Sequence, residues 1–297
     1  MFSGSFVALV TPFKDESVDE EGLRRNIRFQ IENGTSGLVP CGTTGESPTL
    51  SQKEWETVVS ITVEEAKGEV PVIAGTGTNS TKKTVEITRR AKELGATAAL
   101  VVTPYYNRPT QEGLYSHYRS VALETKFPLV LYNVPSRTGV NLLPGTVLRL
   151  SQLEEVVAIK EASGNLAQAG EIVNDCGGRL ALLSGDDVLT FPLLSLGATG
   201  VISVVANLVP GDLSRMIGGF LSGMEEKAKE DHERLLPLCR AMFLETNPIP
   251  VKAAMNILKM PAGKPRLPLT EISEKNRHLL IGTLAQYGLI GKDGTKG

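Results

Sequence analysis

Eight strand-like segments recur along the first 205 residues of the chain, and their rhythm constrains the fold more than any other feature. Each segment is a short apolar run rich in β-branched residues, and helical patterns lie between most of them. Strands that are apolar along their whole length and alternate with helices predict a parallel sheet covered on both faces. The segments span residues 6–10, 37–41, 70–75, 98–103, 129–134, 156–160, 180–185 and 200–205.

Eight is the number of strands that closes a (β/α)8 barrel, the TIM barrel. The alternative is an open doubly wound sheet with a glycine-rich phosphate turn. Gly75-Thr76-Gly77 is the candidate for that turn, but it lacks the third glycine and the later acidic residue. We therefore predict an α/β fold with a barrel domain over residues 1–223.

Only helical patterns occur beyond about residue 210, at 211–223, 225–243, 249–258 and 272–287. We therefore predict a C-terminal helical extension over residues 224–297, in which 292–297 form a frayed tail. Helix boundaries are also visible earlier in the chain. Ser51 and Glu54 have the spacing of a capping box, and Asn79 or Ser80 can cap the following helix.

The charge balance excludes several classes of partner. The chain has 31 basic and 33 acidic residues, a net charge of −2, and no basic patch or charged tail. This argues against binding to nucleic acid or to an anionic membrane. The first residues lack the features of a signal peptide, and the longest apolar runs have only the length of a strand. We expect a cytoplasmic protein.

The cysteines and histidines give no metal-site pattern. Cys41, Cys176 and Cys239 are widely separated, which suits a reducing compartment. The three histidines fall in polar, helix-like segments, so we expect them to be solvated surface residues: His117, His232 and His278. We expect no metal and no cofactor, and acid–base chemistry that does not use histidine.

Lys160 is the residue that most strongly indicates chemistry. It ends the apolar run 156–160, where an unpaired ammonium group is costly to bury. Such a lysine is either paired with a core carboxylate, here Glu161 or Asp186, or kept as a nucleophile. A desolvated amine suits Schiff-base formation with a carbonyl substrate.

Other candidate residues follow neighbouring strands, and barrel active sites lie at these strand ends. The Tyr132 hydroxyl can transfer protons, or the side chain can be an ordinary strand aromatic. Thr43 and Thr44 can bind a carboxylate, or simply form a turn flanked by glycines. Arg137 can hold a second carboxylate bidentately, or lie on the surface of a loop.

Taken together, these segments resemble the dihydrodipicolinate synthase family, in the group of pyruvate-dependent aldolases that includes N-acetylneuraminate lyase. The resemblance spans nearly the whole chain. It implies a condensation of pyruvate with L-aspartate 4-semialdehyde to 4-hydroxy-tetrahydrodipicolinate, in lysine biosynthesis, by a homotetramer. The matching motifs are residues 42–47, 102–107, 131–139, 159–164, 183–187 and 247–252.

The resemblance also implies roles for single residues. Lys160 would form the Schiff base, and Tyr132, Thr43 and Tyr106 would relay protons, with Tyr106 coming from a neighbouring subunit. Thr44 would hold the pyruvate carboxylate. Arg137 would hold the carboxylate of the aldehyde substrate. Backbone groups near Gly185 and Ile202 would line the pyruvate site.

Two alternatives stay open. The chain can be another aldolase of the group, cleaving N-acetylneuraminate or a 2-keto-3-deoxy sugar acid, although Arg137 favours the synthase. It can also be a non-catalytic barrel that binds pyruvate.

The site at which L-lysine inhibits regulated members of the family is only partly matched. Ser47, Asn79 and Tyr105 agree with the pattern. Gln52 and Trp55 replace histidines, and Lys83 replaces a glutamate. An ammonium in place of a carboxylate repels a cationic ligand, so we expect weak or absent inhibition by L-lysine.

Overall fold

The computed structural model describes residues 2–291, which form two compact units. The first unit holds the described residues up to Gly4 together with Pro71–Ile202. The second unit holds Ser5–Val70 and the chain from Ser203 onward.

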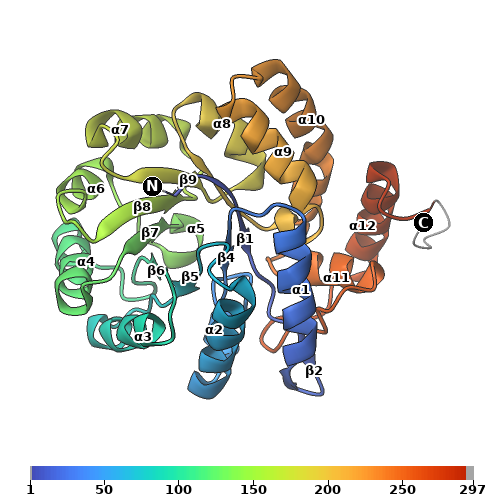
Figure 1. Cartoon of the computed structure of the whole chain (residues 1–297), viewed down its shortest axis with the longest axis horizontal. Helices are drawn as coiled ribbons and strands as arrows, with labels where there is room; N and C mark the ends of the chain where they lie inside the picture. Colours follow the sequence, from blue (N-terminus) through green and yellow to red (C-terminus); the bar gives the residue numbers. More distant parts are fainter. Residues whose placement is uncertain (1, 292–297) are drawn as a thin grey trace. The chain divides into compact units, whose positions relative to one another are not determined.

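The first unit contains a parallel sheet in which the strands follow one another in chain order. Helices α3, α4, α6 and α7 lie along the outer side of these strands (Figure 1). The strands are β5 (Ile73–Gly75), β6 (Ala98–Val102), β7 (Leu129–Asn133), β8 (Val156–Glu161), β9 (Ala181–Ser184) and β10 (Gly200–Ser203). The helices are α3 (Thr81–Glu93), α4 (Gln111–Thr125), α5 (Pro135–Thr138), α6 (Pro144–Leu150), α7 (Leu166–Cys176) and α8 (Thr190–Ser195), with the short 3-10 helix η2 (Asp187–Leu189).

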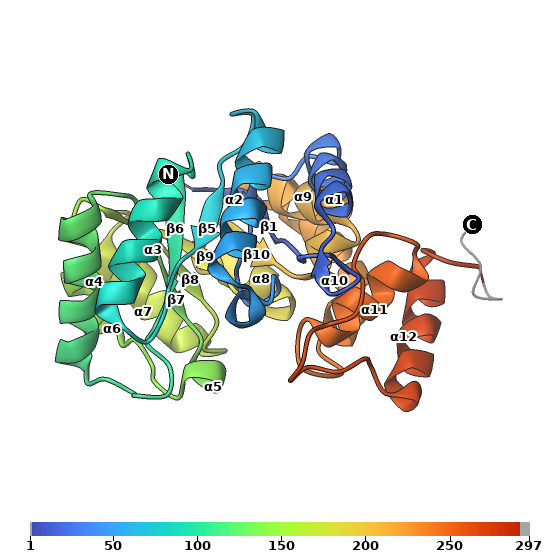
Figure 2. The same cartoon turned by 90° about the horizontal axis from the view of Figure 1, so that it is seen from below.

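The second unit contains the parallel pair β1 (Gly4–Ala8) and β4 (Gly37–Val39) and a small hairpin of β2 (Phe13–Lys14) and β3 (Ser17–Val18). Helix α9 packs against α10, and α11 packs against α12 (Figure 2). The helices are α1 (Glu20–Glu32), α2 (Gln52–Ala66), α9 (Pro210–Leu221), α10 (Glu225–Ala241), α11 (Ile249–Ile257) and α12 (Glu274–Tyr287), with the 3-10 helices η1 (Ser47–Thr49) and η3 (Val205–Asn207).

The predicted fold class is confirmed: eight parallel strands alternate with helices as in a (β/α)8 barrel, and from β10 to residue 291 only helices follow. Each of these eight strands overlaps one of the eight predicted segments, although β1 begins two residues before its segment and β8 ends one residue after its segment. The hairpin was not predicted, because its two-residue turn at Asp15 and Glu16 carries no glycine or asparagine, although both φ angles are positive. The domain boundary between residues 223 and 224 stays a prediction, and the predicted tail at 292–297 lies outside the described residues.

The predicted capping box is confirmed at the start of α2. The Ser51 N–H donates to Glu54 Oε2 at 2.9 Å, and the Glu54 N–H donates to Ser51 Oγ at 3.3 Å. Ser80, rather than Asn79, caps α3. None of the helices within residues 2–291 has both the length and the apolar character needed to cross a membrane.

The prediction that all three histidines are solvated is wrong for two of them. His117 and His232 are buried, whereas His278 is exposed. His117 lies on the buried face of α4 with Leu114, Tyr118 and Val121, at helical spacing. The polar neighbours in the sequence belong to the opposite face of the helix, so local composition was a poor guide to burial.

Candidate active site

Lys160 lies near the end of β8, and its side chain has no hydrogen bond or ion pair with another residue of the described chain. It is buried, with 6% of its surface exposed. Tyr132 of β7 is its direct partner across the sheet, and the Lys160 Nζ lies 4.4 Å from the centroid of the Tyr132 ring. The lysine therefore meets the face of an aromatic ring rather than a carboxylate.

Both carboxylates that could have paired with Lys160 have other partners. Glu161 accepts hydrogen bonds from the Ser163 N–H at 2.6 Å and from Asn133 Nδ2 at 3.0 Å. Asp186 accepts from the Val188 N–H at 2.9 Å and caps η2. Glu161 cannot pair with Lys160 because the two residues are consecutive on β8, and consecutive side chains of a strand point to opposite faces. The ion-pair interpretation of Lys160 is therefore wrong for the described residues.

Gly185 follows β9 and lies against the stem of Lys160. A Cβ atom at this position would lie 3.1 Å from Lys160 Cε and 2.7 Å from Ala162 Cβ. The Gly185 N–H donates to the Glu161 carbonyl at 2.7 Å. Only glycine leaves room here for the lysine side chain in its observed position. Ile202, on β10, is buried.

Tyr106 and Arg137 present their side chains to solvent in the first unit. Tyr106 is 89% exposed and has a φ of 72°, so the backbone of its loop turns sharply. Arg137 lies in the last turn of α5, which ends at Gly139. Sequence reasoning had left a surface position for Arg137 open, and the structure shows that its side chain is exposed.

The loop after β4 in the second unit carries Thr43 and Thr44. Thr44 is buried, and its Oγ1 accepts a hydrogen bond from Asn247 Nδ2 at 3.0 Å. Thr43 is half-buried, and its carbonyl accepts from the Glu46 N–H at 3.1 Å. The Thr44 side chain is thus oriented by the segment just before α11.

Two polar networks were missed by sequence reasoning. In the first unit, Asn133 Nδ2 donates to Asn141 Oδ1 at 2.8 Å, and Asn141 Nδ2 donates to Gln168 Oε1 at 2.7 Å. In the second unit, Lys252 pairs with Glu46 at 2.5 Å, and both side chains are inaccessible to solvent. Residues 247–252 had matched a family motif, which was the available signal for the second network.

Burial changes the acid–base properties of the second network. Desolvation lowers the pKa of Lys252 to about 8, although the Glu46 carboxylate acts in the opposite direction. Arg266 hydrogen-bonds Glu54 at 3.0 Å and holds the pKa of that carboxyl at about 2.

No cluster of three or more potential metal-binding His, Cys, Asp or Glu side chains occurs within residues 2–291.

Comparison with known proteins decides the family. A model of the Dihydrodipicolinate synthetase family matches residues 1–287. The chain belongs to this family. A relative from Geotalea uraniireducens, named 4-hydroxy-tetrahydrodipicolinate synthase, is 53% identical over 290 residues, which cover 98% of this chain and 100% of that protein.

Solved structures agree with this membership of the dihydrodipicolinate synthetase family. The dihydrodipicolinate synthase from Thermotoga maritima superposes with a TM-score of 0.96 at 47% identity, covering 98% of this chain and 100% of that one. The chloride-inhibited enzyme from Acinetobacter baumannii, solved in complex with pyruvate, gives a TM-score of 0.96 at 43% identity, with the same coverage. The resemblance inferred from the motifs is thus confirmed.

Proposed function

We propose that this chain is a 4-hydroxy-tetrahydrodipicolinate synthase, a lyase that condenses pyruvate with L-aspartate 4-semialdehyde. The observation that carries the proposal is the state of Lys160: it is buried, it faces Tyr132 at 4.4 Å, and it has no carboxylate partner in the described chain. A buried amine that no carboxylate holds is placed to attack a carbonyl carbon. The activity named for its full-length relatives supports the same reaction.

The proposed chemistry begins with attack of Lys160 Nζ on the keto carbon of pyruvate, with loss of water, to form an imine. The imine withdraws electrons, so a proton leaves the pyruvate methyl group and an enamine forms. The enamine carbon then attacks the aldehyde of the second substrate, and the aldehyde oxygen becomes a hydroxyl group. The amino group of that substrate finally displaces Lys160 by closing onto the imine carbon.

Protons must enter and leave at several of these steps, and we assign this role to hydroxyl groups. Tyr132 is the proton donor and acceptor beside Lys160, since its ring already contacts the ammonium group. Thr43 and Tyr106 complete the relay. Tyr106 is 89% exposed in the single chain, which agrees with a role in the site of a neighbouring subunit. We accordingly propose a homotetramer in the cytoplasm.

The remaining residues hold the substrates. Thr44 binds the carboxylate of pyruvate, and its orientation by Asn247 agrees with that role. Arg137 binds the carboxylate of L-aspartate 4-semialdehyde, because its planar fork fits a carboxylate bidentately. Gly185 and Ile202 line the pyruvate site through backbone groups. This role of Arg137, which requires an amino-acid aldehyde with a carboxylate, favours the synthase over a sugar-acid aldolase.

The test is to trap the imine. The protein is treated with pyruvate and borohydride, digested, and analysed by mass spectrometry for a reduced adduct on Lys160. Lys227→Met, which removes an exposed lysine paired with Glu230, serves as a control for lysine identity, since its adduct must still map to position 160. An unmodified Lys160 at saturating pyruvate would overturn the Schiff-base mechanism. Turnover of a sugar acid, with none of L-aspartate 4-semialdehyde, would instead overturn the substrate assignment.

A further inference from the structure

The loop that carries Thr43 and Thr44 has a strained backbone at both of its ends. Cys41 and Glu46 have φ angles of 56° and 53°, in the left-handed region that non-glycine residues rarely adopt. The loop is also tightly packed, because a Cβ on Gly45 would lie 3.1 Å from the Cys41 nitrogen. Conformations of this kind persist only when the surrounding structure holds them in place.

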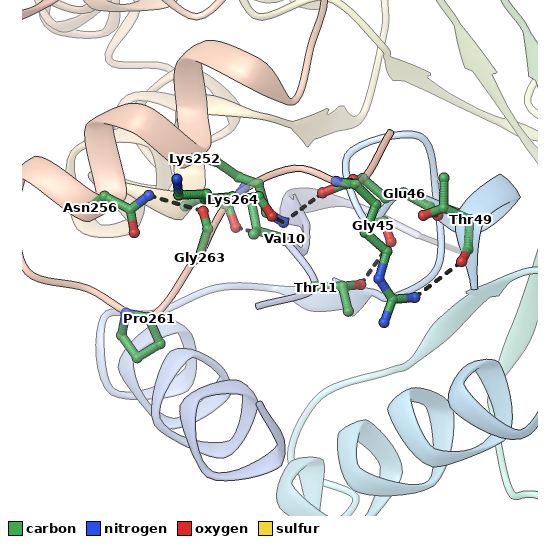
Figure 3. Close-up of polar contacts among 12 residues, drawn as sticks. Val10, Thr11, Gly45, Glu46, Thr49, Lys252, Asn256, Pro261, Gly263 and Lys264 are labelled. Atoms are coloured by element: carbon green, nitrogen blue, oxygen red, sulfur yellow. Dashed lines mark hydrogen bonds and ion pairs between the residues drawn. The ribbon is translucent and has the colours of Figure 1, made fainter. Parts of the chain in front are cut away.

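The buried pair of Glu46 and Lys252 supplies such a hold. Lys252 Nζ lies 2.5 Å from Glu46 Oε1 and also donates to the Lys264 carbonyl at 3.3 Å (Figure 3). The other carboxylate oxygen, Glu46 Oε2, accepts from the Arg266 N–H at 2.8 Å. Both oxygens of Glu46 are therefore bound by one C-terminal segment, residues 247–266, which lies about two hundred residues away in sequence.

The same segment contacts the loop at two further points. Asn247 Nδ2 donates to Thr44 Oγ1 at 3.0 Å, and the Arg266 guanidinium donates to the Thr49 carbonyl at 3.1 Å. On the other side of the loop, the Thr11 hydroxyl donates to the Gly45 carbonyl at 2.7 Å. The centroid of the Phe13 ring lies 4.1 Å from Lys252 Nζ and 4.1 Å from Arg266 Cζ, so both cations contact this ring.

We infer that Lys252 and Glu46 are positioning residues, which set the Thr44 hydroxyl and the loop N–H groups for the carboxylate of the keto acid. This inference rests on the proposed function, in which Thr44 binds pyruvate. Glu46 is only two residues from Thr44, so rotation of its backbone out of the left-handed region would turn the threonine with it. Because the proposed function gives the pair no part in imine formation or in binding of the aldehyde, its loss should weaken binding of pyruvate and leave the later chemistry largely intact.

The experiment measures the pyruvate concentration that gives half-maximal trapping of Lys160 by borohydride, together with KM and kcat for pyruvate. The variants are Lys252→Met and the double variant Lys252→Met/Glu46→Gln. The double variant leaves no unpaired buried charge, so it is expected to fold more readily than Lys252→Met alone. Lys227→Met is the matched control, since Lys227 has an exposed partner, Glu230, at 2.9 Å on α10.

The expected result is a rise of about tenfold or more in half-saturating pyruvate and in KM for both variants, equivalent to about 1.4 kcal/mol or more. The maximal adduct yield and kcat should stay within about threefold of wild type, and Lys227→Met should match wild type. If the double variant is folded and has the wild-type half-saturation, the pair does not position the loop. If wild type itself gives no adduct, the proposed function fails and this inference fails with it.

Discussion

The Lys160 ammonium group lies 4.4 Å from the centroid of the Tyr132 ring, and the two residues are paired directly across β7 and β8. A strand pairing thus fixes the distance between the proposed nucleophile and the proposed proton carrier. Lys252, the other buried lysine described above, is instead held by a carboxylate at 2.5 Å. This contrast is what we expect between a lysine that acts as a nucleophile and a lysine that stabilises the structure.

Tyr132→Phe should retain the ring contact with Lys160 but lose the hydroxyl group. General acid–base groups contribute roughly 10²–10⁴-fold to rate, so we expect kcat to fall by about 10²-fold or more. KM for pyruvate should change little, because in the proposed function Thr44, and not Tyr132, binds the carboxylate. Steady-state kinetics measure this, with Tyr115→Phe on α4 as the control. A Tyr132→Phe enzyme with wild-type kcat would remove Tyr132 from the relay.

Arg137→Lys keeps the positive charge but loses the planar fork. A charge-assisted hydrogen bond contributes about 1.5–3 kcal/mol, so KM for L-aspartate 4-semialdehyde should rise by about tenfold or more. KM for pyruvate should stay within about twofold of wild type. The control is Arg149→Lys, whose arginine pairs with Glu112 at 2.8 Å on the surface. Equal rises in both KM values would argue against a specific contact with the aldehyde substrate.

Lys252→Met should destabilise the protein strongly, because it leaves the Glu46 carboxylate buried without its cation. Removing one member of a buried pair costs about 3–5 kcal/mol, whereas replacing both members often costs little. The double variant Lys252→Met/Glu46→Gln should therefore be more stable than Lys252→Met alone. Guanidinium denaturation monitored by circular dichroism measures the free energies of unfolding. Additive losses in the double variant would show that the two residues do not act as a pair.

His117 should make stability depend on pH below neutrality. Burial lowers its pKa from 6.5 to about 4, while Thr81 Oγ1 lies 2.9 Å from its Nδ1. The unfolded chain therefore binds a proton that the folded chain does not, and stability falls as pH drops from about 6.5 towards 4. The contribution of neutral His117 to the free energy of unfolding is fully present above the unfolded pKa. About 2 kcal/mol of it is lost between pH 7 and pH 5.

Urea denaturation at several pH values measures this effect as the difference between wild type and His117→Gln. His278→Gln is the control, because His278 is exposed. If the difference in free energy of unfolding between wild type and His117→Gln is the same at pH 7 and pH 5, the prediction is wrong.

L-Lysine should inhibit the enzyme weakly or not at all. Gln52 is exposed at the start of α2, and Lys83 is exposed in the first turn of α3. An ammonium group at position 83, where the resemblance implies a glutamate in regulated members, would repel a cationic amino acid. Initial rates with added L-lysine, compared with equal ionic strength of sodium chloride, measure this. Strong inhibition at sub-millimolar L-lysine would refute it.

The sequence by itself determined the features that depend on neighbouring residues. The apolar strand segments, the Ser51–Glu54 capping box and the position of Lys160 at a strand end all follow from local pattern and spacing. The order of the family motifs then indicated the membership that the comparisons confirmed.

Only the tertiary structure decided which polar groups meet. It showed that Glu161 turns to Asn133 and that Lys160 has no carboxylate partner within residues 2–291. It also showed that Lys252 reaches Glu46 across 206 positions of the chain. It also showed that His117 is buried, against the expectation from its polar neighbours. The physical reason is that the energy of a buried charge depends on its partner and on the solvent around it, and neither is a property of the local sequence.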